Sequence, residues 1–193
     1  MFIQSSTSLL SASLQYKTIP IVENRLQLVQ VLRTTRIRTI LLRHCNIFEI
    51  ASLLQDAHQS RVSIYVNIDH IDGIHPDLAG MRYLAEHMHI TGVLSNHPRT
   101  LSLSKSFGME TIQRIFAVDS TGLEMALESV DTQSTDLLDI SPAIVVPYVS
   151  ATLKALLPLP FIASGLISTT QQIKEIIRAG ALGVTISRPE LWL

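Results

Sequence analysis

Cysteine is almost absent from this sequence, because Cys45 is the only one among 193 residues. A single thiol cannot form a disulfide framework or a cysteine-rich zinc site, and such low usage is typical of a reducing compartment. Charged residues are also few, at 16% of the chain, and the formal net charge is −1. Non-specific binding to phosphates is built from clustered lysine and arginine, so this composition argues against a protein that coats nucleic acid. Any contact with RNA must be local.

Long hydrophobic runs are missing as well. No apolar segment approaches the roughly 18 residues that cross a membrane, so we predict a cytoplasmic protein with no membrane partner. Residues 1–16 carry no charge and therefore lack the basic region that begins a secretory signal. We expect this stretch to be structural and to add a helix that covers one end of the fold.

Hydrophobic residues make up 47% of the chain, which excludes a disordered protein and predicts one compact domain over residues 1–193. Short β-branched runs alternate with helix-like segments at intervals of roughly 20 to 25 residues, as in repeated βα units around a parallel sheet. We predict strands at Thr18–Val22, Thr39–His44, Ser63–His70, Gly92–Asn96, Thr111–Val118, Leu137–Ile140, Pro160–Ala163 and Gly183–Ser187. We predict helices that include Arg25–Arg33, Phe48–His58, Asp77–Met88, Leu123–Val130, Val149–Leu156 and Thr170–Ala179.

Eight strands alternating with helices favour an α/β fold of the TIM type, a (β/α)8 barrel, over an open doubly wound sheet. The barrel must be abbreviated at this length. Because the sequence ends at Leu193, just after the eighth strand, we expect the closing helix to be short or missing.

The segments around the seventh and eighth strands predict an anion site. In barrels the loops after these strands form a phosphate site, where small residues let backbone N–H groups approach the anion. Ser164, Gly165 and Leu166 follow the seventh strand, and Ser187 and Arg188 follow the eighth. The same residues are also ordinary turn residues, so a purely structural role stays open.

Polar residues within the predicted strands indicate a polar barrel interior. Because side chains alternate along a strand, Asn67 and Asp69 are expected to point inward when their apolar neighbours face the helices. The same alternation turns Asp139 and Arg114 inward, with Arg114 as the counter-ion of the carboxylates. A stabilising Asp–Arg network without a ligand is the alternative.

Several histidines lie near strand ends and raise the question of a metal site. His44, Asp69, His70 and His97 show no tight metal-ligand spacing, and Asp69 and His70 are adjacent strand residues that point to opposite faces. We therefore predict no metal site and no cofactor.

Five arginines between Arg25 and Arg43 form the densest basic segment. Within it, Arg33, Arg36 and Arg38 lie at a helix-to-strand junction, which places them at the amino-terminal rim of a barrel. They form either an RNA-contact patch or a solvated helix end.

The order of these motifs resembles the glycerol uptake operon antiterminator regulatory proteins. The resemblance covers most of the chain, and its segments are 67–74 with Asp77 and Gly80, 92–95, 112–116 with Asp119 and Ser120, 136–142, 163–166, and 179–181 with Thr185, Ser187, Leu191 and Trp192. It implies a barrel-like fold without catalysis. It also implies glycerol 3-phosphate or a similar phosphorylated small molecule as effector, and leader mRNA as target.

The chain departs from this family at several positions, as a diverged member would. Ser164 stands where the family usually has glycine, Asp139 where it has glutamate, and Ala143 where it has glycine. After the fourth strand, the family has a threonine and a basic residue before a lysine-rich helix. Here the sequence is Asn96-His97-Pro98-Arg99, and Lys105 is the one lysine in the helix that follows.

We therefore predict a ligand-responsive transcription antiterminator and not an enzyme. The effector phosphate is expected on Ser164, Gly165, Leu166, Ser187 and Arg188, and the polyol at Asp69, Arg114 and Asp139. His97, Arg99 and Lys105 are the RNA-contact candidates that the resemblance implies. A homo-oligomer is compatible with the sequence.

Two other classes of function remain open. One is a phosphate-sugar isomerase, lyase or decarboxylase that uses Asp69 or Asp119 as general acid or base. Neither a lysine suited to Schiff-base chemistry near the mouth nor a convincing metal cluster supports it. The other is a degenerate barrel that acts as an interaction module.

Overall fold

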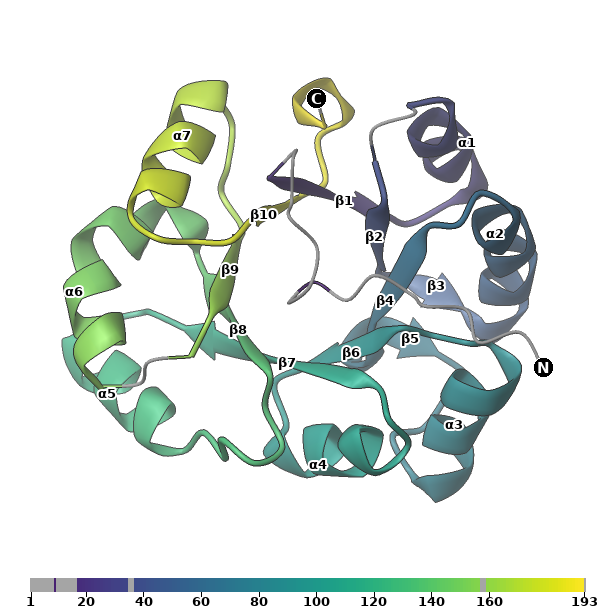
Figure 1. The fold of residues 1–193 in the computed structure, drawn as a ribbon, viewed down its shortest axis with the longest axis horizontal. Helices are drawn as coiled ribbons and strands as arrows, with labels where there is room; N and C mark the ends of the chain where they lie inside the picture. The colour runs from purple at the N-terminus through teal and green to yellow at the C-terminus, as the bar shows by residue number, and fades with distance from the viewer. Residues whose placement is uncertain (1–8, 10–16, 35–36, 157–158, 193) are drawn as a thin grey trace.

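The computed structural model describes residue 9 and residues 17–34, 37–156 and 159–192. Eight parallel strands close into a barrel in the order β1-β10-β9-β8-β7-β6-β4-β2, and helices surround it (Figure 1). This architecture confirms the predicted TIM-type fold. The barrel strands are β1 Thr18–Val22, β2 Thr39–Leu42, β4 Ser63–Asn67, β6 Gly92–Ser95, β7 Glu110–Phe116, β8 Leu137–Ser141, β9 Phe161–Ser164 and β10 Val184–Ile186.

The helices begin where side chains satisfy their first N–H groups. Asn24, Asn46, Asp77, Asp119 and Thr169 each accept a hydrogen bond from the backbone of the turn that follows them. Such caps fix a helix start, because the first N–H groups have no partner within the helix. The helices are α1 Arg25–Arg33, α2 Ile47–Gln59, α3 Leu78–Arg82, α4 Pro98–Ser106, α5 Ser120–Glu128, α6 Val146–Leu156 and α7 Thr170–Arg178.

Several predicted elements differ in extent, and three of these differences change the local structure. The helix predicted from Asp77 to Met88 is α3 followed by a π-helical turn over Tyr83–His87. The helix predicted from Leu123 begins at Ser120, because the cap at Asp119 starts it earlier. The strand predicted from Ser63 to His70 ends at Asn67, and a 3-10 turn over Ile68–His70 follows it. That early end changes where Asp69 points.

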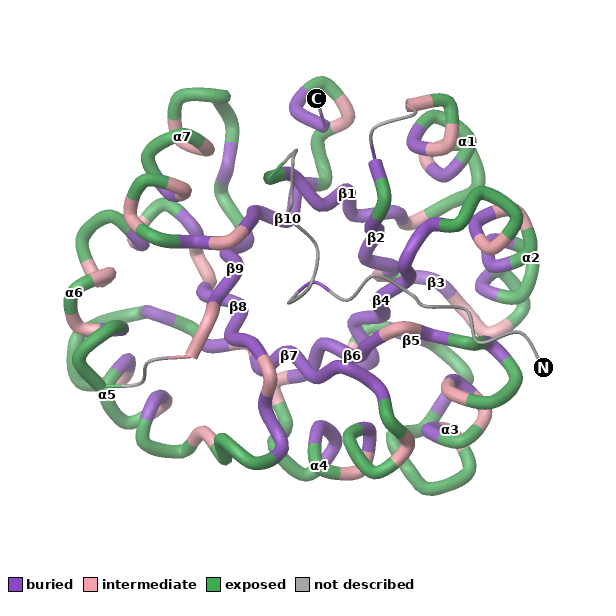
Figure 2. Tube along the Cα trace, in the orientation of Figure 1, coloured by how far each residue is buried: buried purple, intermediate pink, exposed green. Residues whose placement is uncertain are grey.

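Alternation along the strands divides the apolar side chains between two cores. One set packs between the barrel and the helices, and Figure 2 shows the buried strands inside a ring of helices with exposed outer faces. The other set fills the barrel interior and consists of Leu9, Ile19, Ile21, Leu41, Tyr65, Leu94, Ile112, Leu137 and Ile162. The interior is therefore packed, as is usual for such barrels.

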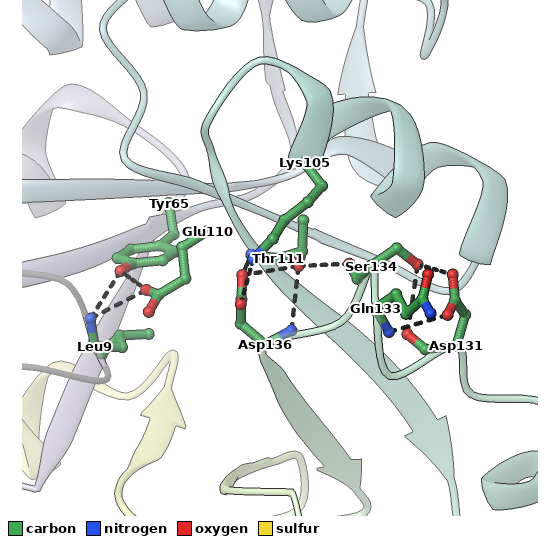
Figure 3. Close-up of polar contacts among 9 residues, drawn as sticks. All are labelled: Leu9, Tyr65, Lys105, Glu110, Thr111, Asp131, Gln133, Ser134 and Asp136. Atoms are coloured by element: carbon green, nitrogen blue, oxygen red, sulfur yellow. Dashed lines mark hydrogen bonds and ion pairs between the residues drawn. The ribbon is translucent and has the colours of Figure 1, made fainter.

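Polar contacts hold Leu9 at the amino-terminal end of the barrel interior. Its backbone N–H lies 2.9 Å from the Tyr65 hydroxyl and 3.1 Å from Glu110 Oε2, and the Tyr65 hydroxyl also bonds to Glu110 (Figure 3). Leu9 is 2% exposed. The rest of the uncharged stretch that we expected to cover one end of the fold lies outside the described residues.

A short turn takes the place of a closing helix. After β10, the chain forms a 3-10 turn over Pro189–Leu191. Trp192 then donates its indole N–H to the Ile186 carbonyl at 2.8 Å, and its own carbonyl accepts from Thr18 at 3.2 Å. These contacts tie the end of the barrel to its first strand. Among the described residues, no helix combines the length and the apolar character needed to cross a membrane.

Gly92 marks a close approach within the barrel. A Cβ at this position would overlap the Tyr65 ring and lie 2.6 Å from the Glu110 carbonyl oxygen. We expect Gly92→Ala to lower the free energy of unfolding by about 1–3 kcal/mol, the usual range for overpacking. Chemical denaturation measures this change. The control is Gly122→Ala in the first turn of α5, where alanine favours the helix. If Gly92→Ala is as stable as the wild type, the interior has room for a side chain at Gly92.

Candidate functional site

A pocket of about 120 Å³ opens at the carboxyl-terminal end of the barrel strands. The carboxyl ends of parallel strands meet at one rim, so loops distant in sequence come together there. Its lining residues are Ile21, Arg43, Arg114, Ser141, Ser164, Gly165, Leu166, Ile167, Thr185, Ile186 and Ser187. This is the rim where ligands bind in barrels of this type.

The loop after β9 has an unusual backbone. Gly165 has φ +86° and Leu166 has φ +58°, so two successive residues are in the left-handed region. A Cβ on Gly165 would lie 3.3 Å from Ser141 Oγ and would narrow the pocket. Leu166 is 69% exposed, although it is apolar. This loop therefore presents backbone to the pocket at Gly165, and holds an exposed apolar side chain at its edge.

The structure brings together four of the five residues predicted for phosphate binding. Ser164, Gly165, Leu166 and Ser187 all line the pocket. Arg188 is not among the lining residues: its side chain is 55% exposed and lies 3.8 Å from Glu190. Arg188 is thus at the rim, outside the wall of the pocket.

A buried ion pair forms beside the pocket. Arg114 Nε and Nη2 lie 2.8 and 2.7 Å from Asp139 Oδ2, and Ser164 Oγ donates to the same oxygen at 3.0 Å. The two side chains are 9% and 0% exposed. Their strands pair with Arg114 opposite Asp139. The predicted inward pair of Arg114 with Asp139 is confirmed.

The prediction that Asp69 joins this pair is wrong. Its carboxylate accepts from Ser95 Oγ and from the Asn96 N–H, both at 2.7 Å. Within the described part of the chain, no hydrogen bond or ion pair joins Asp69 to Arg114. The reason is the early end of β4, which puts Asp69 in a 3-10 turn where strand alternation no longer holds.

Arg43 is a pocket residue that sequence reasoning missed. It follows β2 directly and lines the pocket, while its Nε and Nη2 lie 3.0 and 2.8 Å from Glu23 Oε1. Its position at the carboxyl-terminal end of a predicted strand indicates a residue at the pocket rim. In the sequence, Arg43 belongs to the basic segment that begins at Arg25.

The histidines near the strand ends form a ring contact. The rings of His44 and His70 meet edge to face, with centroids 4.8 Å apart. Burial, followed by the neighbouring His44 and Arg114, lowers the pKa of His70. A neutral His70 adds no positive charge to the rim at pH 7. Over the described ranges, no three His, Cys, Asp or Glu side chains are placed to hold a metal ion.

The three RNA-contact candidates do not form one patch. His97 and Arg99 lie at the start of α4 on the pocket side of the barrel and are exposed. Lys105 lies in the last turn, about 9 Å further along the helix axis. There it pairs with Asp136, which also accepts from the Thr111 N–H and hydroxyl at 3.0 Å (Figure 3). Lys105 therefore lies away from His97 and Arg99, and its charge is paired within the fold.

The arginine cluster lies at the opposite end of the barrel from the pocket. Arg33 ends α1, and Arg38 precedes β2, so both lie at the amino-terminal rim, where they are exposed. Arg36 lies outside the described residues.

The family model of the glycerol-3-phosphate responsive antiterminators matches residues 18–192. The chain belongs to this family. The match runs from the first strand of the barrel to the turn that closes it. The protein is thus a regulator of the antiterminator type, as the resemblance in the order of its motifs implied.

Two solved structures share this barrel, and one curated protein is similar in sequence. The glycerol uptake operon antiterminator regulatory protein of Listeria monocytogenes superposes with a TM-score of 0.81 at 22% identity, over 92% of this chain and 95% of that one. An antiterminator-related protein of Thermotoga maritima gives 0.79 at 19% identity, over 91% and 96%. The uncharacterized protein YgcP of Escherichia coli K12 is 21% identical over 147 residues, 76% of each chain. At these identities, the two structural matches support the fold.

The Arg114–Asp139 pair should contribute strongly to stability. Removing one partner of a buried pair leaves the other charge without compensation, which costs on the order of 3–5 kcal/mol. We expect Arg114→Met to lose this much free energy of unfolding at pH 7, measured by chemical denaturation. Arg38→Met removes an exposed guanidinium and should change stability by less than about 0.5 kcal/mol. Similar stabilities would mean that the Asp139 charge is satisfied without Arg114.

Proposed function

We propose that the pocket at the carboxyl-terminal rim binds the phosphate of glycerol 3-phosphate, and that occupancy controls binding of the protein to leader mRNA. The observation that carries this proposal is that residues from several loops line one pocket. It joins the left-handed turn at Gly165 and Leu166 with Ser187 and with two arginines, Arg43 and Arg114.

The phosphate end is assigned to the loops after β9 and β10. A phosphate needs hydrogen-bond donors that approach closely, and a glycine without a Cβ lets backbone come nearest. Ser187 adds a hydroxyl donor after β10, and Ser164 lines the site while its hydroxyl donates to Asp139. Leu166 shields the edge of the site. Arg188, outside the wall, contributes charge from the rim.

The polyol end is assigned to the side of β7 and β8. Arg114 lines the pocket with Asp139 directly behind it, so a donor and an acceptor lie next to one another. Hydroxyl groups are matched by such a pair because each hydroxyl both donates and accepts. Asp69 accepts hydrogen bonds from Ser95 and Asn96, so we assign it no contact with the polyol.

The RNA surface is assigned to the same rim. His97 and Arg99 are exposed at the start of α4, next to the end of β6. When effector and RNA use loops at one rim, ligand that orders these loops favours RNA binding if RNA prefers the ordered state. A pocket and an RNA surface at opposite ends would require coupling through the packed barrel.

Hydrogen bonds at the two candidate acid–base groups favour the regulatory role over the enzyme alternative. Asp119 accepts from the Gly122 N–H at 2.7 Å and caps α5. Asp69 accepts two hydrogen bonds from residues at the end of β6. A general acid or base must reach a substrate proton. Both carboxylates instead hold local backbone in place.

The phosphate assignment predicts a selective loss of binding in Gly165→Val. In the parent protein, glycerol 3-phosphate at about 100 times its Kd should stabilise the fold by about 2.7 kcal/mol, seen as a rise in Tm. The valine side chain should occupy the approach to the loop and abolish this rise. Calorimetric titration with glycerol 3-phosphate checks the affinity directly.

The matched control for this variant is Gly108→Val. Gly108 has φ +76°, close to that of Gly165, and a Cβ there meets no atom within 4 Å. It precedes β7 at the other end of the barrel, so it carries similar backbone strain without touching the pocket. The phosphate site lies elsewhere if Gly165→Val binds glycerol 3-phosphate as well as Gly108→Val does.

The RNA assignment predicts a shallow salt dependence. With few cations at the rim, the slope of log affinity against log salt should be about −2 to −3. Arg99→Gln should reduce its magnitude by about one phosphate contact, whereas Arg38→Gln at the opposite rim should leave it unchanged. Filter binding to the leader transcript of the operon that encodes the chain, with glycerol 3-phosphate present, measures the slope. No association at low salt would refute the RNA role.

A further inference from the structure

Two buried polar side chains beside the pocket are incompletely paired. Asp139 is 0% exposed and Thr185 is 2% exposed. Asp139 Oδ1 and Thr185 Oγ1 have no hydrogen-bond partner among the residues that the structure describes. Their strands, β8 and β10, flank β9, and Thr185 lies opposite Ser164 in the strand register. The two atoms thus belong to one arc of the barrel interior, at the level of the pocket.

Only one of the two carboxylate oxygens of Asp139 accepts hydrogen bonds from the described residues. Arg114 Nε, Arg114 Nη2 and Ser164 Oγ all lie within 3.0 Å of Oδ2. An arginine that faces a carboxylate often spreads its two donors over both oxygens. Here every one of these donors converges on a single oxygen. Oδ1 keeps its full capacity to accept, in an interior where an unpaired acceptor is costly.

We propose that Asp139 Oδ1 and Thr185 Oγ1 recognise the hydroxyl groups of the effector, so that the pocket selects a phosphate ester of a polyol over the corresponding phosphorylated ketone. This inference rests on the proposed function, because it assigns specificity within the same pocket. A carboxylate oxygen only accepts, so a ligand hydroxyl can donate to it. A ketone oxygen at the same place cannot donate and is repelled by the carboxylate.

The wall of the pocket explains how a ligand reaches these atoms. Arg114, Ser164 and Thr185 line the pocket, and Asp139 lies directly behind Arg114 and Ser164. In this proposal the hydroxyls of the ligand enter beside Arg114 and Ser164 and pair with Oδ1, while both side chains continue to hold Oδ2.

The first measurement compares three probes on the wild-type protein by calorimetric titration: glycerol 3-phosphate, dihydroxyacetone phosphate and inorganic phosphate. A site that hydrogen-bonds a ligand hydroxyl rejects an analogue that lacks it, so glycerol 3-phosphate should bind at least about tenfold more tightly than dihydroxyacetone phosphate. Equal affinities for these two esters overturn the inference and leave the phosphate site in place. If none of the probes binds, the proposed function itself fails, and the inference fails with it.

The second measurement uses Thr185→Val, which keeps the shape of the side chain and removes the hydroxyl. Because this hydroxyl has no partner among the described residues, the unliganded protein should be as stable as the wild type or more stable. Affinity for glycerol 3-phosphate should fall about fivefold, with affinity for inorganic phosphate unchanged, because the lost hydroxyl no longer pairs with the ligand. An unchanged affinity for glycerol 3-phosphate would exclude Thr185 from recognition.

Thr18→Val is the matched control. The Thr18 hydroxyl is also buried, but it donates to the Trp192 carbonyl at the start of β1, at the other end of the barrel. Its loss should lower the Tm and leave the ligand preference intact. Asp139→Asn adds a test of the carboxylate, because an amide N–H can donate to a ketone. A folded Asp139→Asn protein should therefore lose the preference, and retention of the wild-type ratio counts against the role of Oδ1.

Discussion

The buried pair of Arg114 and Asp139 is the interaction on which the carboxyl-terminal half of the barrel depends. Two charges taken out of water are tolerated only when their geometry and additional hydrogen bonds repay the loss of hydration. Two guanidinium nitrogens and the Ser164 hydroxyl meet one oxygen of Asp139, which joins β7, β8 and β9 in a single polar contact. The ion pair thereby fixes the strands that carry the pocket wall.

The polar side chains at the two ends of the barrel have different roles. At the amino-terminal end, Tyr65 and Glu110 bind the Leu9 backbone, and Lys105 binds Asp136 next to Thr111 (Figure 3). The charges of Glu110, Lys105 and Asp136 are thus paired or hydrogen-bonded within the fold. At the carboxyl-terminal end, a pocket is lined by Gly165 and by Thr185, whose hydroxyl has no partner among the described residues. The polar groups of the amino-terminal end are thus used for structure, whereas those beside the pocket include the stabilising Arg114–Asp139 pair as well as groups open to a ligand.

Much of this arrangement could be predicted from the sequence. Each of the eight predicted strands overlaps an observed barrel strand, because β-branched runs bounded by helical segments leave few alternatives. Side-chain alternation placed Arg114 and Asp139 together correctly, since both lie well inside their strands. The same rule failed for Asp69, where the strand ends at Asn67 and a tight turn follows. Element ends depend on local hydrogen bonds that periodicity does not encode.

The direction of α4 separates the RNA-contact candidates along the barrel axis. In a barrel of βα units, each helix runs back from the carboxyl-terminal rim to the amino-terminal rim, so its first and last turns face opposite ends. Arg99 and Lys105 share α4, but Arg99 lies in its first turn at the pocket rim and Lys105 in its last turn, where it pairs with Asp136. For the proposed RNA surface at the pocket rim, the positive charge of α4 therefore comes from its first turn. Coupling between effector and RNA then needs only the loops that surround the pocket, since the rest of the barrel is a packed core that resists small displacements.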